Sequence, residues 1–317
     1  MKQLAIREHD MMNEFSNQEL IKWLKLITVG NGLGPVKLQK LLERYDNNLD
    51  TIFSTPVSEL LSLRFLNEKI INSFNSLKNA NDEKFYQLIE ICKQNKIKII
   101  PFISNDYPNS LKDIPSPPLT LYLLGNYGLL KKKPSIAIVG TREASQLAKE
   151  FARSFGKGLS NSRIIVTSGG ALGIDTSAHI GALDSDIKET ISVLPTGFFH
   201  PYPTENKNLF EDIVSNNGLL ISENSPNFKG ATYAFLQRNR IISGLADSIL
   251  IVAAGETGGG LEQIKVAYAQ KKPIFCPRLT KNILPNGGIK RAINEYGAIE
   301  IDTVDQIIES LPVYSRI

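Results

Sequence analysis

The chain has 317 residues, of which 42% are hydrophobic and 21% charged, and its formal net charge is +4. This composition excludes a disordered chain, and the two cysteines and three histidines lack the spacing of a zinc site or a disulfide framework. The mild positive charge permits an anionic partner without requiring one. Because the chain has neither an apolar leader nor an apolar stretch of transmembrane length, it is expected to be cytoplasmic and to have no membrane partner.

Residues 1–80 are expected to form a small all-helical domain. After a polar leader, apolar residues recur at three- and four-residue steps over 16–27, and a glycine-rich turn at 29–35 separates them from a second helix at 37–45. This outline resembles a helix-hairpin-helix unit, whose turn can hold a phosphate of nucleic acid. Residues 54–75 repeat the outline without the glycines. A nucleic-acid role and a plain accessory bundle both fit this pattern.

A second domain is expected over residues 81–317, with its core starting near residue 134. A helix at 82–93 and a strand at 97–103 come first. The proline-rich stretch 105–125 is predicted to be extended or turning and not helical, because proline lacks a backbone donor and restricts the residue before it.

From residue 135 onward, apolar strands alternate with helical segments. The pattern predicts strands at 136–139, 164–167, 190–194, 219–222, 249–253 and 274–277, and helices near 144–160, 174–184, 205–216, 233–244, 260–271, 288–296 and 302–311. Such alternation is typical of an α/β fold with a doubly wound, mostly parallel sheet. Ligands of these sheets bind beyond the carboxyl ends of the strands, so the residues after each strand are the candidates for a site.

Four glycine turns and three arginines are expected to converge on this edge of the sheet. Arg142 follows the first predicted strand, residues 168–173 the second, residues 195–207 the third and residues 255–260 the fifth. Residues 238–240, Arg-Asn-Arg, open a helix or lie within it. Glycine lets a phosphate approach the backbone closely, and arginine offers it a planar fork of donors. The pattern therefore predicts a site for a polyanion or a phosphorylated ligand.

The sequence contains no convincing catalytic constellation, and no metal or cofactor is expected. Asp175 is expected to orient the glycine turn through backbone hydrogen bonds. His179, in the following helix, is expected to cap or pack there and not to catalyse.

The order and spacing of motifs over roughly residues 16–300 resemble the DNA-processing protein A family, also called DprA or Smf. The matching segments are Tyr107-Pro108, Pro117-Pro118, Val139-Gly-Thr-Arg142, Ser168-Gly-Gly-Ala-Leu-Gly-Ile-Asp175, Tyr202-Pro203 and Arg238-Asn-Arg-Ile-Ile-Ser-Gly244. The resemblance implies an extended Rossmann-like domain behind a SAM-like helical domain. The segment 257–264 and Leu236, where relatives carry a proline, depart from the family pattern.

The resemblance also implies a function and a set of binding residues. Members of this family bind single-stranded DNA, protect incoming strands in natural transformation and help to load the RecA recombinase. The resemblance therefore implies that this protein is not an enzyme. By position, the DNA-binding residues would be Gly140, Thr141, Arg142, Ser168, Gly169, Gly170, Gly173, Lys207, Arg238, Asn239, Arg240, Gly258 and Gly259. Binding directed mainly at phosphates predicts weak sequence preference and strong dependence on salt.

The resemblance further implies a homodimer formed through the Rossmann-like domain. The helix at 288–296 could provide the dimer face or belong to the ordinary core. The winged helix found at the C-terminus of many members is expected to be absent.

A second function, as a LOG-type nucleotide-binding protein or as an enzyme of that group, is also compatible with the glycine turns. LOG-type Rossmann proteins include nucleoside-monophosphate phosphoribohydrolases, which carry Gly-Gly-x-Gly-Thr followed by a glutamate. Residues 258–262, Gly-Gly-Gly-Leu-Glu, partly match that pattern, and Glu262 would be the catalytic acid. The missing threonine and the early position of the glutamate favour the DNA-binding hypothesis.

Overall fold

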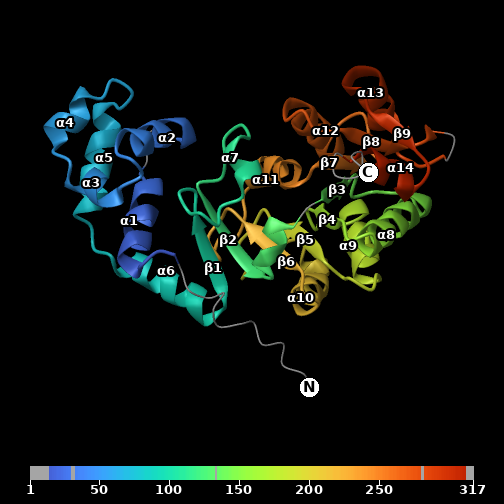
Figure 1. The fold of residues 1–317 in the computed structure, drawn as a ribbon, viewed down its shortest axis with the longest axis horizontal. Coiled ribbons are helices and arrows are strands. Elements are labelled where there is room, and N and C mark those ends of the chain that lie inside the picture. Colours follow the sequence, from blue (N-terminus) through green and yellow to red (C-terminus); the bar gives the residue numbers. More distant parts are fainter. Residues whose placement is uncertain (1–13, 30–32, 133, 280–281, 312–317) are drawn as a thin grey trace. The chain divides into compact units, whose positions relative to one another are not determined.

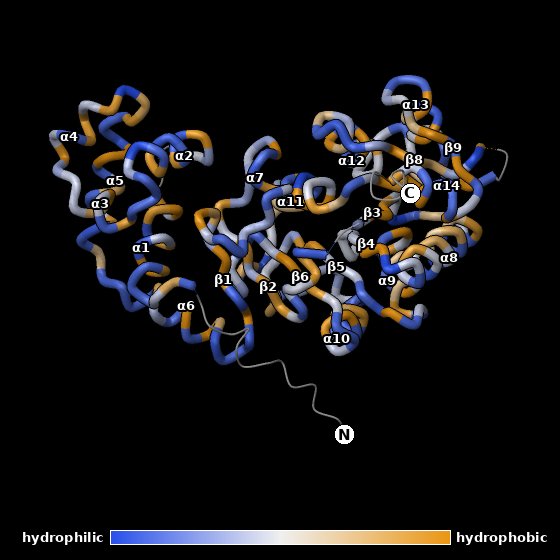
Figure 2. The backbone as a smooth tube through the Cα atoms, viewed as in Figure 1, coloured by the Kyte–Doolittle hydropathy of each residue, from blue (hydrophilic) through white to orange (hydrophobic). Residues whose placement is uncertain are grey.

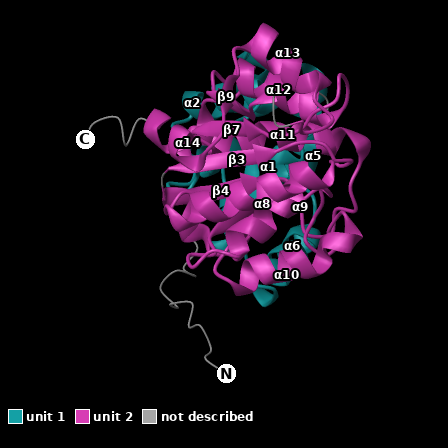
Figure 3. Cartoon of the chain, turned by 90° about the vertical axis from the view of Figure 1, so that its right-hand side faces the viewer, with its two compact units in different colours: residues 1–107, 116–121 teal, residues 108–115, 122–317 magenta. Residues whose placement is uncertain are grey.

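A computed structural model describes residues 14–29, 33–132, 134–279 and 282–311 (Figure 1). The polar leader up to residue 13 and the glycines at the centre of the 29–35 turn lie outside the described residues. The chain divides into two compact units, residues 1–107 with 116–121 and residues 108–115 with 122–317 (Figure 3).

The first unit is mainly helical. It contains α1 (Asn17–Ile27), α2 (Pro35–Arg44), α3 (Leu49–Ser54), α4 (Val57–Ser62), α5 (Glu68–Lys78), α6 (Glu83–Gln94) and strand β1 (Ile97–Pro101). α1 begins at a reciprocal capping box between Ser16 and Glu19. Trp23 is fully buried at the centre of the unit and donates its indole N–H to Thr120 Oγ1 at 2.8 Å. Hydrophilic and hydrophobic segments alternate along these helices (Figure 2), because each helix buries only one face.

The nine strands form one sheet in the order β1-β2-β6-β5-β4-β3-β7-β8-β9. Their bounds are β2 (Thr120–Gly125), β3 (Ser135–Val139), β4 (Ile165–Ser168), β5 (Thr190–Val193), β6 (Leu219–Ser222), β7 (Ser248–Ile251), β8 (Ile274–Pro277) and β9 (Ile299–Ile301). Neighbours from β6 through β9 pair in parallel, and β2 pairs antiparallel with β6. The predicted α/β class with a doubly wound, mostly parallel sheet is confirmed.

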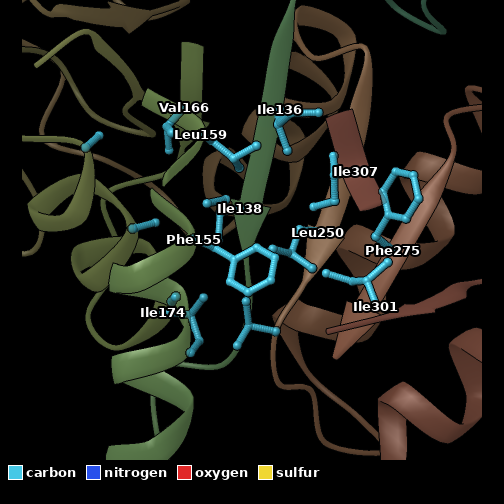
Figure 4. Close-up of a cluster of buried hydrophobic side chains, with 14 of the residues drawn as sticks. Ile136, Ile138, Phe155, Leu159, Val166, Ile174, Leu250, Phe275, Ile301 and Ile307 are labelled. Carbon is cyan, nitrogen blue, oxygen red and sulfur yellow. The ribbon is translucent and has the colours of Figure 1, made fainter. Parts of the chain in front are cut away.

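The helices of the second unit cover both faces of the sheet (Figure 1). α8 (Gln146–Asn161), α9 (Ile174–Leu183), α10 (Lys207–Ser215) and α14 (Val304–Ser310) share one face, while α11 (Thr232–Leu245), α12 (Gly259–Ala269) and α13 (Gly287–Tyr296) share the other. On the first face, Ile138, Phe155, Val166, Leu250 and Phe275 belong to one buried cluster (Figure 4). Burial of these large apolar side chains on the parallel strands stabilises the edge where the strands end.

One sequence prediction about local structure is wrong. The prolines of the stretch 105–125 predict that it contains no helix, but α7 (Asn109–Lys112) follows Pro108 directly. Proline occupies the cap position of this short helix, where a missing N–H removes no helical hydrogen bond. Within the described ranges, no helix has both the length and the apolar character needed to cross a membrane.

The close packing of α8 on α9 generates a stability prediction. A Cβ on Gly181 would lie 2.0 Å from the backbone oxygen of Arg153, whereas a Cβ on Gly259 would meet nothing within 4 Å. We expect Gly181→Ala to lower the free energy of unfolding by about 1–3 kcal/mol, because the two helices must move apart. Gly259→Ala, the matched control, should change it by less than about 0.5 kcal/mol in urea denaturation. Equal midpoints for the two variants would contradict the close packing.

Candidate nucleic-acid interface

A cleft of about 630 Å³ lies beyond the carboxyl ends of β3 and β7 in the second unit. Its walls come from the loop after β3, from α11 and from the loop that leads into α12. The lining residues among the sequence candidates are Gly140, Thr141, Arg142, Arg238, Asn239, Gly258 and Gly259. Gly169 lines a smaller cavity of about 60 Å³ together with Arg142 and Arg238. The predicted convergence at the strand ends is therefore present for the loops after β3 and β7 and for α11.

One wall of the cleft combines a cation with two aromatic rings. Arg142 is exposed, and its guanidinium carbon lies 5.7 Å from the centre of the Phe235 ring. Phe235 meets Tyr202 edge to face, with 5.1 Å between the ring centres. A guanidinium over a ring keeps its charge available to an anion, and the exposed Tyr202 and half-buried Phe235 rings offer flat apolar surface to a planar ligand. This wall can contact a phosphate and a base at the same time.

The N-terminus of α12 forms a second wall. Gly258 caps the helix with a φ of 94°, a conformation that favours glycine. The N–H groups of Gly259 and Gly260 belong to the first turn of α12, so they have no acceptor inside the helix. A Cβ at Gly258 or Gly259 would meet no protein atom within 4 Å. No acceptor for these two N–H groups is found among the described residues, and the open space in front of Gly258 and Gly259 suits an anion.

The sequence predicts that the turn at 168–173 holds a phosphate, but two of its N–H groups are bound to a side chain of the protein. The N–H groups of Gly169 and Ala171 donate to Asp175 Oδ2 at 3.1 and 3.4 Å. Ser168 Oγ is buried and donates to the Ile138 carbonyl at 2.6 Å. These bonds confirm that Asp175 orients the turn, and they direct two of its amides towards the protein.

The two remaining glycines of this turn are required by packing. Gly170 has a φ of 68°, and a Cβ there would lie 2.5 Å from the Phe210 ring. Gly173 has a φ of 83°, and its Cβ would lie 2.5 Å from the carbonyl oxygens of Thr141 and Arg142. Neither residue lines the cleft, so their role as DNA contacts stays a prediction.

Arg238 forms the floor of the cleft. It is only 6% exposed, and its Nη1 donates to the Val193 carbonyl at 2.8 Å. A Cβ on Gly169 would lie 1.7 Å from this Nη1, so the guanidinium rests directly on the glycine backbone. Burial lowers the pKa of the Arg238 guanidinium and raises the pKa of the Asp175 carboxyl, while the charge of each group opposes the shift of the other.

The structure does not bring Lys207 and Arg240 into the cleft. Lys207 is the exposed first residue of α10 and lies 4.0 Å from Glu211. Arg240 forms a two-pronged ion pair with Glu223, with nitrogen–oxygen distances of 3.1 and 2.6 Å. Two of the three predicted arginines therefore face the cleft, and the third is bound to a carboxylate elsewhere.

Sequence reasoning did not assign the aromatic wall. Tyr202 belongs to a Tyr-Pro motif, and Phe235 directly precedes Leu236, where relatives carry a proline. The available signal was their position, because Tyr202 lies in the segment after the third predicted strand and Phe235 lies one helical turn before Arg238. Both positions place the side chains near the carboxyl ends of the strands, where the glycine turns lie.

His179 has a structural role. It is fully buried, and its Nδ1 lies 2.9 Å from Thr190 Oγ1, which itself donates to the Val166 carbonyl. Because the threonine hydrogen is already used, the histidine must donate from Nδ1. Burial, and after it the charge of Arg238, lowers the pKa of His179 to about 3.

The residue required by the enzyme alternative lies outside the cleft lining. Glu262 pairs with Lys265 at 2.7 Å, one turn along α12. Within the described part of the chain, no group of three or more His, Cys, Asp or Glu residues could hold a metal ion. The geometry thus favours anion binding over the proposed hydrolysis.

A Rossmann-like sheet with a cleft lined by glycines and arginines, at the point where the strand order reverses, is typical of proteins that bind nucleotides and other phosphorylated ligands. Residues 98–312 match the family model of DNA recombination-mediator protein A, and the chain belongs to this family. The predicted DprA/Smf resemblance is confirmed.

Relatives and solved structures support this assignment. Protein Smf of Borreliella burgdorferi is 31% identical over 294 residues, which cover 92% of this chain and 89% of the relative. DNA processing protein DprA of Bacillus subtilis is 34% identical over 235 residues, covering 73% and 78%. The structure of DprA from Streptococcus pneumoniae matches with a TM-score of 0.76 and 26% identity, covering 94% and 99%. DprA from Helicobacter pylori, described by its single-stranded DNA binding mode, matches with a TM-score of 0.58 and 28% identity, covering 68% and 95%.

The lowered pKa of His179 generates a prediction about pH. The unfolded histidine titrates near its ordinary pKa of about 6.5, so between about pH 6.5 and 3 the unfolded chain binds a proton that the folded protein excludes. Stability should therefore fall as the pH drops, and His179 alone should account for about 1.4 kcal/mol between about pH 7.5 and 5.5. Urea denaturation of His179→Gln should show a smaller loss than the wild type over this range. The exposed His200→Gln is the control, and a loss of equal size in both variants would contradict the assignment.

Proposed function

We propose that this protein binds single-stranded DNA in the cleft between the loop after β3, α11 and the N-terminus of α12. The observation that carries the proposal is the combination of exposed Arg142, the free amides of Gly259 and Gly260, and the Tyr202–Phe235 pair. Phosphates would bind to the arginine and the amides, while bases would stack on the rings. The single-stranded DNA binding described for the Helicobacter pylori relative supports the same conclusion.

The aromatic wall favours a single strand over a duplex. Bases in a duplex are stacked on each other, so their faces cannot reach Tyr202 and Phe235 without unpairing. Donors aimed at phosphates carry no sequence information, and we expect little preference among sequences. Lys207, Arg240, Ser168, Gly170 and Gly173 remain proposed contacts that would require the strand to extend beyond the cleft.

We infer that the protein acts by binding and not by catalysis, because the acid on the cleft floor, Asp175, is engaged by the turn that it orients. Its role would be the family's: protecting incoming DNA in natural transformation and helping to load a RecA-type recombinase, in the cytoplasm where both are found. The helical residues 1–80 would form the SAM-like domain of this protein.

Arg142 provides the direct test of the cleft. We expect Arg142→Ala to weaken binding of a labelled oligo-dT by about tenfold or more and to reduce the slope of log K against log salt by about 1. Arg278→Ala is the matched control, because Arg278 is also exposed but lies after β8 and pairs with Asp302. Gel retardation over a salt series measures both quantities. Unchanged binding by Arg142→Ala would overturn the site, and preference for duplex DNA would overturn the proposed specificity.

We propose that the homodimer forms through the α12–β9 edge, a surface made by Tyr268, Tyr296 and Ile299. β9 is the last strand of the sheet, so its outer edge has no strand partner in the described chain. Ile299 is 53% exposed and Tyr268 is 56% exposed, and Tyr268 meets Tyr296 edge to face at 5.3 Å. A second copy of the same edge would pair with these strand groups and cover the apolar side chains.

Ile299→Lys tests this interface. A charge at the centre of the edge should shift the protein from dimer to monomer in light scattering, because a lysine buried against its own symmetry copy is repelled. Val36→Lys is the control, since Val36 is 63% exposed but lies on α2 in the first unit. A dimer of equal stability in both variants would contradict the proposed edge.

A further inference from the structure

The floor of the cleft contains a carboxyl group where an anion is expected to bind. Asp175 is 4% exposed, and it lines the same cleft as Arg142 and Arg238. A carboxylate repels phosphate, and the repulsion is strongest where water is excluded. Its presence therefore requires a reason beyond orientation of the turn, which a neutral side chain could also provide.

The neighbouring guanidinium supplies that reason. Arg238 is buried against Gly169, and Val193 provides a neutral carbonyl acceptor for its Nη1. Its Nε is buried without a hydrogen-bond partner among the described residues. A buried cation is costly without an opposite charge nearby. Asp175 accepts the N–H of Gly169, the residue against which the Arg238 guanidinium rests, so the two groups lie close together. The charge of Asp175 accordingly opposes the lowering of the Arg238 pKa by burial. Burial raises the pKa of the Asp175 carboxyl, and Arg238 and two backbone N–H groups oppose that shift because they favour the ionised form.

We propose that Asp175 is a counter-charge that limits the affinity of the cleft for the phosphates of single-stranded DNA. Asp175 offsets the charge of Arg238, so that the exposed Arg142 and the amides of α12 provide most of the attraction. Asp175 does not contact the strand, and its charge acts both by offsetting Arg238 and by repelling phosphate across the cleft. The inference rests on the proposed function and adds to it a built-in limit on binding strength, which favours release of the strand.

The other charged groups at the cleft do not provide this effect. Glu143 also lines the cleft, but it is exposed, so water and salt screen its charge. His179, one helical turn after Asp175, is neutral because its pKa is lowered to about 3. Among the groups that line the cleft, the buried carboxylate is therefore the anion whose charge is screened least.

Asp175→Asn tests the proposal without removing the turn's hydrogen bonds. Both N–H groups donate to the same oxygen, Oδ2, and the amide oxygen of asparagine can accept both. We expect this variant to bind oligo-dT roughly tenfold more tightly than the wild type at ~0.1 M salt and to show a steeper salt dependence. Glu143→Gln, which removes the same charge at an exposed position, should tighten binding by less than roughly threefold. Equal or weaker binding by Asp175→Asn would overturn the proposal.

A second pair of variants answers the question if Asp175→Asn alone fails to fold. Asp175→Asn combined with Arg238→Gln leaves no uncompensated buried charge. The double variant should bind oligo-dT more tightly than Arg238→Gln alone, because the lone carboxylate of the single variant repels phosphate. Equal or weaker binding by the double variant would assign Asp175 a structural role only. Failure of the proposed function would look different. In that case the wild type itself would not retard oligo-dT, and both proposals would be wrong.

Discussion

The contact between the Arg238 guanidinium and the backbone of Gly169 fixes the geometry of the whole cleft. It joins α11 to the turn after β4, and the bond from Arg238 to Val193 joins both to β5. Asp175 then ties the turn to the start of α9. Because each of these groups is buried and partnered by a group on another element, the floor can move only if several elements move together. The exposed binding groups thus rest on a rigid base.

Much of this architecture could be predicted from the sequence, because its signals are local and strong. Strands β6 and β8 begin and end at the predicted residues, and the capping box at Ser16 marks the start of α1. Elements too short to show periodicity were not foreseen. The helix α3 has six residues and the strand β9 has three, so each depends on tertiary packing and not on a repeating pattern.

The site was harder to predict, because the role of a side chain depends on the direction in which it points. Arg238 and Arg240 are two residues apart on one helix, so their side chains point about 200° apart around its axis. Arg238 lies in the cleft, whereas Arg240 is bound to Glu223.

The turn at 168–173 also shows that residue type alone does not predict a binding role. Its glycines indicated donors available to a phosphate, but the acceptor for two of those donors is Asp175, six and four residues further on. Residue type and spacing identify the edge of the sheet, and only three-dimensional structure distinguishes a group that binds from one that supports.

The glycines of this protein fall into two classes with different reasons for the missing side chain. At Gly169, Gly170 and Gly181, a Cβ would collide with the protein itself, so folding alone excludes other residues. At Gly259, the backbone is ordinary and nothing lies within 4 Å, so the folded chain places no steric demand on that position. A requirement for glycine there would originate in the bound molecule. Position 259 therefore offers a route to a separation-of-function variant, in which a larger side chain blocks the cleft while the fold is retained.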